Sequence, residues 1–205
     1  MNLTYWIFYL FFQLMFYFFR GKVNGREYPP ESGSFILASN HISYFDPPLV
    51  AAFTSREMFF FAKKELFKNW LFAAMLRKVN ARPVRRGVFD RGGIETAVQL
   101  LEKGKGLVIF PEGTRSLTDD FLSAKPGIGM IACQAKVSIV PVYIHGSNAL
   151  WKCFFGAAKL RITYGKPLSK DYIDSFEAGK ESYIAITEEI MRRIKALKEK
   201  TLSSK

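Results

Sequence analysis

The sequence predicts a single α/β domain with a mixed, largely parallel sheet flanked by helices, preceded by a hydrophobic membrane helix at the N-terminus. Short apolar segments typical of buried strands alternate with segments of helical periodicity, which is the pattern of α/β folds. The chain has 205 residues, enough for one domain with a substantial core. We expect a membrane anchor at residues 1–20, the domain at residues 21–200 and a flexible tail at residues 201–205.

The N-terminal segment, residues 3–19, is suited to lipid. It carries no formal charge, ten of its seventeen residues are aromatic, and neither a basic stretch before it nor a small-residue cleavage site after it indicates a signal peptide. At about 1.5 Å per residue it would measure roughly 26 Å against a hydrocarbon core of roughly 30 Å, which favours a short span or a re-entrant or interfacial helix over a tilted span. Arg20, Lys22 and Arg26 then place the domain on the cytoplasmic face. A buried core helix is the disfavoured alternative.

The first half of the domain alternates buried and amphipathic segments. After a turn-rich stretch at residues 23–30, the apolar residues 34–39 predict a short strand. Asp-Pro-Pro then resembles a helix start, with a helix over residues 49–53. Residues 58–62 are apolar and short enough for a second strand, whereas residues 65–79 have an aromatic face at helical spacing.

The second half continues the alternation. Residues 89–103 have helical apolar spacing and end before Gly104, a residue typical of helix C-termini. The remaining elements follow from apolar runs and periodicity: strands at residues 107–110, 138–144 and 160–164, and helices at residues 128–135 and 181–200. Pro141 indicates that its strand lies at an edge of the sheet or contains a bulge.

Composition limits the classes of partner. The formal charge of +12 indicates an anionic partner: nucleic acid, an anionic membrane surface or a phosphorylated substrate. The two cysteines, Cys133 and Cys153, lie far apart and form no Cys-x-x-Cys pair, so neither a zinc site nor a redox motif is indicated. We therefore expect no metal and no bound cofactor.

His41 is one of only two histidines, and Asp46 follows it five residues later. The pair lies just beyond the strand at residues 34–39, where open α/β sheets bind ligands. A carboxylate bonded to one ring nitrogen leaves the other to act as a general base near neutral pH. Asn40 and Ser43 are candidate supporting residues. The alternative is an ordinary loop histidine beside an aspartate that caps a helix.

A second motif, Phe-Pro-Glu-Gly-Thr-Arg-Ser at residues 110–116, leaves a buried strand through a tight loop. Exposed backbone N–H groups, the Thr114 hydroxyl and an arginine are the components of a phosphate-binding loop. Arg115 can bind phosphate bidentately, Gly113 permits close backbone approach, and Glu112 can orient the arginine or accept a substrate hydroxyl. The alternative is a structural turn with a surface ion pair.

Together, the motifs at residues 40–46 and 110–115 resemble those of the 1-acylglycerol-3-phosphate acyltransferase family of glycerolipid acyltransferases. The resemblance runs from about residue 22 to about residue 168. It implies that His41 is the general base and Asp46 orients it, and that Arg86 and the Glu112–Arg115 loop bind the acceptor's phosphate. Lys125 also matches the family and is a supporting residue.

The resemblance implies transfer of an acyl group from an acyl thioester, acyl-CoA or acyl carrier protein, to the hydroxyl of 1-acyl-sn-glycerol 3-phosphate. The product would be phosphatidate, made at the cytoplasmic face of the cell membrane in phospholipid biosynthesis. The implied partners are a lysophospholipid acceptor, the acyl donor and an anionic membrane surface, with no nucleic acid. A variant mechanism passes through an acyl-enzyme at Cys133 or Ser43.

Two alternatives differ in substrate or in class. The acceptor could be glycerol 3-phosphate or another lyso-lipid, because Arg85 stands where many members of the family have an acidic residue. The non-enzymatic alternative is a basic membrane- or RNA-binding protein that uses the segment 63–91, in which lysines and arginines alternate with aromatics.

Overall fold

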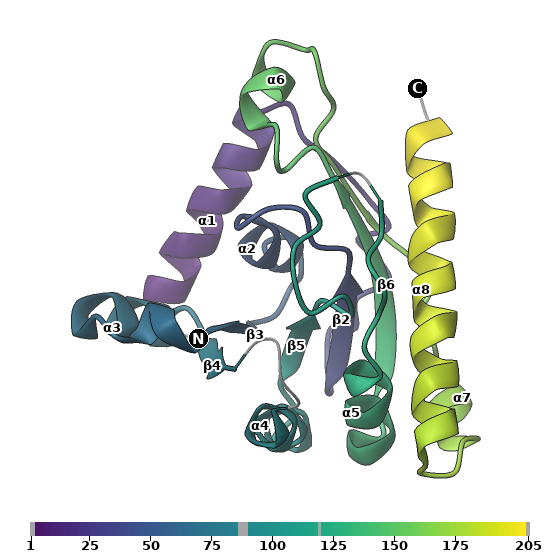
Figure 1. The fold of residues 1–205 in the computed structure, drawn as a ribbon. Helices are drawn as coiled ribbons and strands as arrows, with labels where there is room; N and C mark the ends of the chain where they lie inside the picture. The colour runs from purple at the N-terminus through teal and green to yellow at the C-terminus, as the bar shows by residue number, and fades with distance from the viewer. Residues whose placement is uncertain (1–2, 86–89, 119, 204–205) are drawn as a thin grey trace.

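The computed structural model describes residues 3–85, 90–118 and 120–203. Its centre is a seven-stranded sheet in the order β1-β7-β6-β2-β5-β3-β4 (Figure 1). All neighbouring strands pair in parallel except β6 and β7, which are antiparallel. The strands are β1 (Lys22–Asn24), β2 (Phe35–Ser39), β3 (Met58–Lys63), β4 (Ala81–Val84), β5 (Gly106–Ile109), β6 (Ser138–His145) and β7 (Arg161–Tyr164). The predicted α/β class with a mixed, mostly parallel sheet is confirmed.

Helices cover both faces of the sheet. The helices are α1 (Leu3–Phe18), α2 (Asp46–Ala51), the 3-10 helix η1 (Lys64–Phe67), α3 (Trp70–Lys78), α4 (Arg91–Glu102), α5 (Gly127–Ala135), α6 (Leu150–Phe154), α7 (Lys170–Asp174) and α8 (Lys180–Ser203). One core lies under α1 and α2, and the other lies under α4, α5 and α8 (Figure 1). The central strand β2 contributes Phe35 and Leu37 to the first core and Ile36 and Ala38 to the second, because successive side chains of a strand point to opposite faces.

The predicted helix at residues 65–79 is wrong as one continuous element. The 3-10 helix η1 occupies its start, and α3 begins only at Trp70. The side chain of Asn69 accepts a hydrogen bond of 3.0 Å from the backbone N–H of Phe72, which caps the new helix.

The sheet is wider than the sequence predicted. Its two edges are the short strands β1 and β4, which carry too few apolar residues to show a periodicity. The inference that Pro141 marks an edge strand is wrong, because β6 lies between β7 and β2. Proline is tolerated there because it lies at the end of the pairing of β6 with β7: its carbonyl accepts a hydrogen bond of 2.8 Å from the N–H of Gly165, and only the return bond to Gly165 is missing.

The N-terminal segment is helical as predicted, but it packs on the domain. Tyr5, Tyr9, Phe12 and Phe16 recur along one side of α1 and are buried in the core that α1 shares with α2. The Tyr5 hydroxyl accepts a hydrogen bond of 2.7 Å from the backbone N–H of Met58. Across residues 3–85, 90–118 and 120–203, no helix combines the length and the apolar character needed to cross a membrane. The expected membrane helix is thus a 16-residue helix with one face in the core.

The last helix runs into the segment predicted as a flexible tail. Helix α8 continues to Ser203, and Thr201 is buried, with its hydroxyl 2.8 Å from that of Thr163 in β7. The apolar stripe predicted for residues 181–200 is found, since Ile186, Ile190 and Ile194 are fully buried.

Candidate active site

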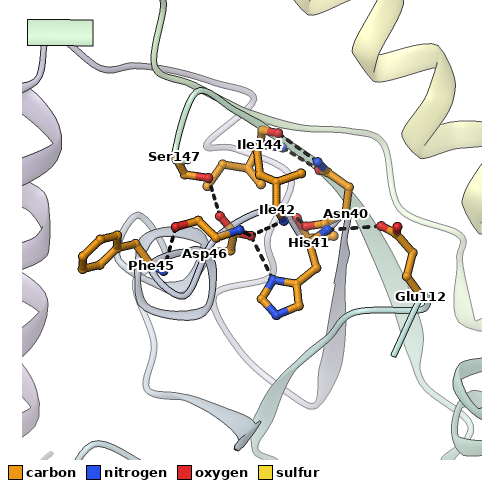
Figure 2. A network of polar contacts seen from close by, with 10 residues as sticks. Asn40, His41, Ile42, Phe45, Asp46, Glu112, Ile144 and Ser147 are labelled. Carbon is orange, nitrogen blue, oxygen red and sulfur yellow. Dashed lines mark hydrogen bonds and ion pairs between the residues drawn. The ribbon is translucent and has the colours of Figure 1, made fainter. Parts of the chain in front are cut away.

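His41 and Asp46 lie together at the carboxyl end of β2 (Figure 2). The Nδ1 atom of His41 is 2.9 Å from Oδ2 of Asp46. The two residues are 2% and 0% exposed, and the ring of Phe110 stacks on the imidazole at a centroid distance of 4.1 Å. Because a carboxylate only accepts hydrogen bonds, it favours the tautomer with the proton on Nδ1 and leaves the lone pair on Nε2.

Asp46 is the first residue of α2, but its side chain does not cap that helix. Its Oδ2 atom instead accepts hydrogen bonds from the preceding backbone N–H groups of Ile42, at 2.6 Å, and Ser43, at 2.7 Å. The prediction that Asp46 caps the helix is therefore wrong, and His41 is bonded to the carboxylate of Asp46. The same oxygen that holds the imidazole also closes the loop.

Ser147 completes the surroundings of Asp46, and sequence analysis missed it. Its hydroxyl donates a hydrogen bond of 2.5 Å to Oδ1 of Asp46, and it is 2% exposed. Ser147 lies in the loop after β6, and β6 pairs in parallel with β2. The only signal in the sequence was that the strand at residues 138–144 could end beside the one that precedes His41.

Asn40 and Ser43, the predicted supporting residues, hold the backbone of the same loop. The Asn40 amide donates to the carbonyl of Ile144 at 2.9 Å and accepts from the Ile144 N–H at 2.8 Å. This buried side chain thus extends the pairing of β2 with β6 beyond Ser39. The Ser43 hydroxyl accepts a hydrogen bond of 3.2 Å from the N–H of Phe45.

Glu112 lies beside His41, and its carboxylate is engaged by backbone groups. Oε1 accepts a hydrogen bond of 3.2 Å from the His41 N–H, and Oε2 accepts one of 2.8 Å from the Leu122 N–H. Burial raises the pKa of this carboxyl above its ordinary value, although both hydrogen bonds act in the opposite direction. A buried carboxylate used in this way repels a phosphate, so its position suits holding the His41 loop.

The remaining residues of the predicted phosphate-binding loop lie around this carboxylate. Gly113 has a φ of +70°, and a side chain added there would meet Lys125 at 3.3 Å. The guanidinium of Arg115 lies 3.5 Å from the centroid of the Tyr44 ring, and Thr114 is exposed. Arg86, the other predicted phosphate ligand, lies outside the described residues.

A cavity of about 520 Å³ opens beside His41 and runs between α4 and α5. Its lining is mostly apolar and includes Val108, Ile94 and Ile131. Among the described residues that line it, the cations are Arg85, Lys125 and Lys180, and the one acid is Asp90. Asp90 caps α4 and accepts a hydrogen bond of 2.7 Å from the Arg85 N–H. The cavity thus offers an apolar groove together with positive charge beside the imidazole.

Comparisons with known proteins point to one family of enzymes. A family model described as Acyltransferase matches residues 20–145. The chain is 32% identical over 180 residues to the 1-acyl-sn-glycerol-3-phosphate acyltransferase of Bacillus subtilis, covering 87% of this chain and 88% of that one. It is 30% identical over 180 residues to the Streptococcus pneumoniae enzyme of the same name, covering 87% and 66%.

A solved structure resembles the whole fold. The crystal structure of the 1-acyl-sn-glycerophosphate acyltransferase PlsC from Thermotoga maritima superposes with a TM-score of 0.67 at 26% identity. The match covers 91% of this chain and 79% of that one.

Proposed function

This chain belongs to the acyltransferase family, and we propose that it transfers a fatty acyl group from an acyl thioester to the free hydroxyl of 1-acyl-sn-glycerol 3-phosphate. The product is phosphatidate. The observation that carries the proposal is the buried bond between His41 and Asp46 at the mouth of an apolar cavity with basic residues in its lining. That combination suits proton transfer from a lipid hydroxyl whose neighbouring phosphate is negatively charged.

The reaction needs no covalent enzyme intermediate in this proposal. His41 Nε2 accepts the proton of the acceptor hydroxyl as its oxygen attacks the thioester carbonyl carbon. Asp46 stabilises the imidazolium that forms. The C–S bond of the tetrahedral intermediate then breaks, and the departing sulfur takes the proton from His41, which yields the ester and a free thiol. A thioester is reactive enough for direct attack, so neither Ser43 nor Cys133 needs to carry the acyl group.

The groups around His41 are of two kinds, one suited to an acyl chain and the other to the acceptor's phosphate. The apolar cavity between α4 and α5 suits an acyl chain. Arg115, Lys125 and Arg86 are the proposed ligands of the acceptor's phosphate, together with the backbone at Gly113 and the hydroxyl of Thr114. Both donors considered, acyl-CoA and acyl carrier protein, are anionic and suit the net charge of +12.

The lipid substrate implies a membrane partner. The outward face of α1 is apolar, with Leu10 54% and Leu14 61% exposed. We propose that this face lies in the interfacial region of the cytoplasmic leaflet as an in-plane helix, which replaces the span or re-entrant turn considered from the sequence.

Replacement of His41 tests the proposed function. His41→Ala should lower the rate of phosphatidate formation at least about 10³-fold, because it removes the general base. The assay is mass spectrometry of the products from a panel of lyso-acceptors with acyl-CoA and acyl carrier protein donors. The matched control is His145→Ala, at the end of β6, which should retain most activity. An active His41→Ala protein contradicts the proposal.

A further inference from the structure

The loop between β6 and β7, residues 146–160, forms an exposed projection that we call the α6 segment. It includes α6 and lies beside the C-terminal end of α1 (Figure 1). The ring of Phe154 stacks on that of Phe18 in α1 at a centroid distance of 4.9 Å and an interplanar angle of 24°. Trp151 meets Phe19 edge-on at 5.8 Å. The α6 segment is therefore fixed to α1 although the two lie far apart in the sequence.

The outward side of the α6 segment is aromatic. Trp151 is 68% exposed and Phe155 is 77% exposed, next to a helix end on which Tyr17 and Phe18 are 53% and 60% exposed. The α6 segment and the end of α1 thus each present large exposed aromatic side chains, and they are joined by the contact of Phe18 with Phe154. Contiguous apolar surface of this kind marks a contact with a partner or a membrane.

The charge of these two segments favours a membrane over a protein partner. Residues 3–26 and 146–160 contain no aspartate or glutamate, and their bases are Arg20, Lys22, Arg26, Lys152 and Lys159. Arg20 lies beside the α6 segment, since a side chain added at Gly156 would lie 3.5 Å from its guanidinium. Exposed Trp and Phe among lysines and arginines, without acids, match the interfacial region of an anionic bilayer.

We propose that the α6 segment is a second membrane-inserting element, in which Trp151 and Phe155 enter the headgroup region of an anionic bilayer beside α1. The proposal rests on the proposed function, which requires a lipid acceptor. It adds that membrane contact is made by two segments remote in sequence. One of them begins with the loop that carries Ser147, whose hydroxyl bonds to Asp46. Membrane contact therefore lies close to the catalytic pair.

Tryptophan fluorescence reports the insertion directly. The chain has three tryptophans, so the full-length variant Trp6→Phe, Trp70→Phe retains Trp151 alone. With vesicles of dioleoylphosphatidylglycerol we expect a blue shift of its emission and quenching by lipids brominated on the acyl chain. Vesicles of dioleoylphosphatidylcholine should give a much smaller response. An unshifted emission, under conditions where sedimentation shows the protein bound to the vesicles, overturns the proposal.

A double variant measures how much the insertion contributes. Trp151→Ser with Phe155→Ser should weaken binding to phosphatidylglycerol vesicles at least about tenfold, because two large apolar side chains lose their burial. The matched control is Ile184→Ser with Leu202→Ser, two exposed apolar residues of α8, whose binding should not change. Vesicle binding equal to wild type in the Trp151, Phe155 variant overturns the proposal.

Two further measurements separate this proposal from its alternatives. In detergent micelles the Trp151, Phe155 variant should form phosphatidate at the wild-type rate, which also shows that it is folded. His41→Ala should still bind vesicles without forming product, so a failure of the proposed function is distinguishable from a failure of the membrane site. If the double variant abolishes a lipid-free dimer seen by sedimentation, and vesicle binding is unchanged, a second copy is the partner and the proposal is overturned.

Discussion

Two neighbouring loops at the carboxyl edge of the sheet differ in how firmly they are held. In the His41 loop, residues 40–46 after β2, the side chains of Asn40, His41, Ser43 and Asp46 are buried, and the Asp46 carboxylate has four hydrogen-bond donors around it. In the Glu112 loop, residues 110–116 after β5, Thr114 is exposed and Arg115 contacts only the face of an aromatic ring in the interactions described. Proton transfer needs a fixed geometry, whereas recognition of a charged headgroup tolerates an adjustable side chain.

Glu112 belongs to the first loop in its contacts, although it belongs to the second in sequence. Its carboxylate accepts from the His41 N–H, and the carbonyl of His41 accepts a hydrogen bond of 2.8 Å from the N–H of Ser116. The comparison therefore predicts large losses of kcat for residues that hold the His41 loop. It predicts losses confined to KM for residues that reach out of the Glu112 loop.

The largest effect in this comparison is expected for Asp46→Asn. The Oδ2 atom accepts from two backbone N–H groups and from the imidazole, and the amide substitutes an NH₂ group for one carboxylate oxygen. The imidazole then loses its preferred tautomer, and kcat should fall about 10³-fold. Steady-state kinetics measures it, with circular dichroism as the control for folding. A loss of less than about threefold would show that Asp46 only closes the loop.

Glu112→Gln separates positioning from phosphate binding. The NH₂ group of glutamine would face one of the two backbone N–H donors, so the His41 loop should shift and kcat should fall about thirtyfold, the effect of roughly 2 kcal/mol. The KM for 1-acyl-sn-glycerol 3-phosphate should stay within about twofold. A raised KM with an unchanged kcat would instead favour a role in binding the acceptor.

The same variant has a signature in stability against pH. Because burial raises the pKa of Glu112, the folded state binds more protons than the unfolded state between the ordinary and the raised pKa. The contribution of this group to stability is complete below its ordinary pKa and is lost as the pH rises through the raised value. Urea unfolding of wild type and Glu112→Gln across this range should show the extra decline in wild type only. If the free energy of unfolding depends on pH in the same way in both proteins, the prediction is wrong.

The two motifs of the site could be predicted from the sequence, because each lies within one short segment of the chain. The motifs at residues 40–46 and 110–115 follow buried strands, and parallel strands bring their carboxyl ends to one edge, so the proximity of His41 and Glu112 could be anticipated. The hydrogen-bond donors to the carboxylate oxygens of Asp46 and Glu112 could not be predicted from the sequence. Ser147 reaches Asp46 across 101 residues, and the Leu122 N–H reaches Glu112 from a loop without periodicity.

The fold shows the same limit. Segments with strong apolar patterns, such as those now seen as β2, β5 and α8, were found at nearly their observed bounds. The edge strands β1 and β4 were missed because they are three and four residues long and are stabilised by pairing with a neighbour. The charge-free run at residues 3–19 indicated lipid, but only the packed structure shows that one side of it faces the core.

Arg115→Ala tests whether the Glu112 loop binds the acceptor's phosphate. Loss of a charge-assisted contact with the acceptor's phosphate should raise the KM for the acceptor about tenfold while kcat remains within about twofold. Arg115→Lys is the matched control, which keeps the charge and should restore part of the affinity. If kcat falls and KM does not change, Arg115 acts on the His41 loop through Tyr44, and the two loops are not divided in function.

Ser147→Ala is expected to have the smallest effect, and it tests whether a residue outside the His41 loop helps to hold Asp46. It removes the hydroxyl that donates to Oδ1 of Asp46, while the three donors at Oδ2 remain. Because one hydrogen bond to a charged group is lost and the others persist, kcat should fall about fivefold to tenfold with KM unchanged. Ser147→Thr keeps the hydroxyl and should restore kcat, which a loss of packing alone would not do. If Ser147→Ala is fully active, the hydrogen bond from Ser147 is not needed to hold Asp46, and the α6 segment makes no contribution to catalysis.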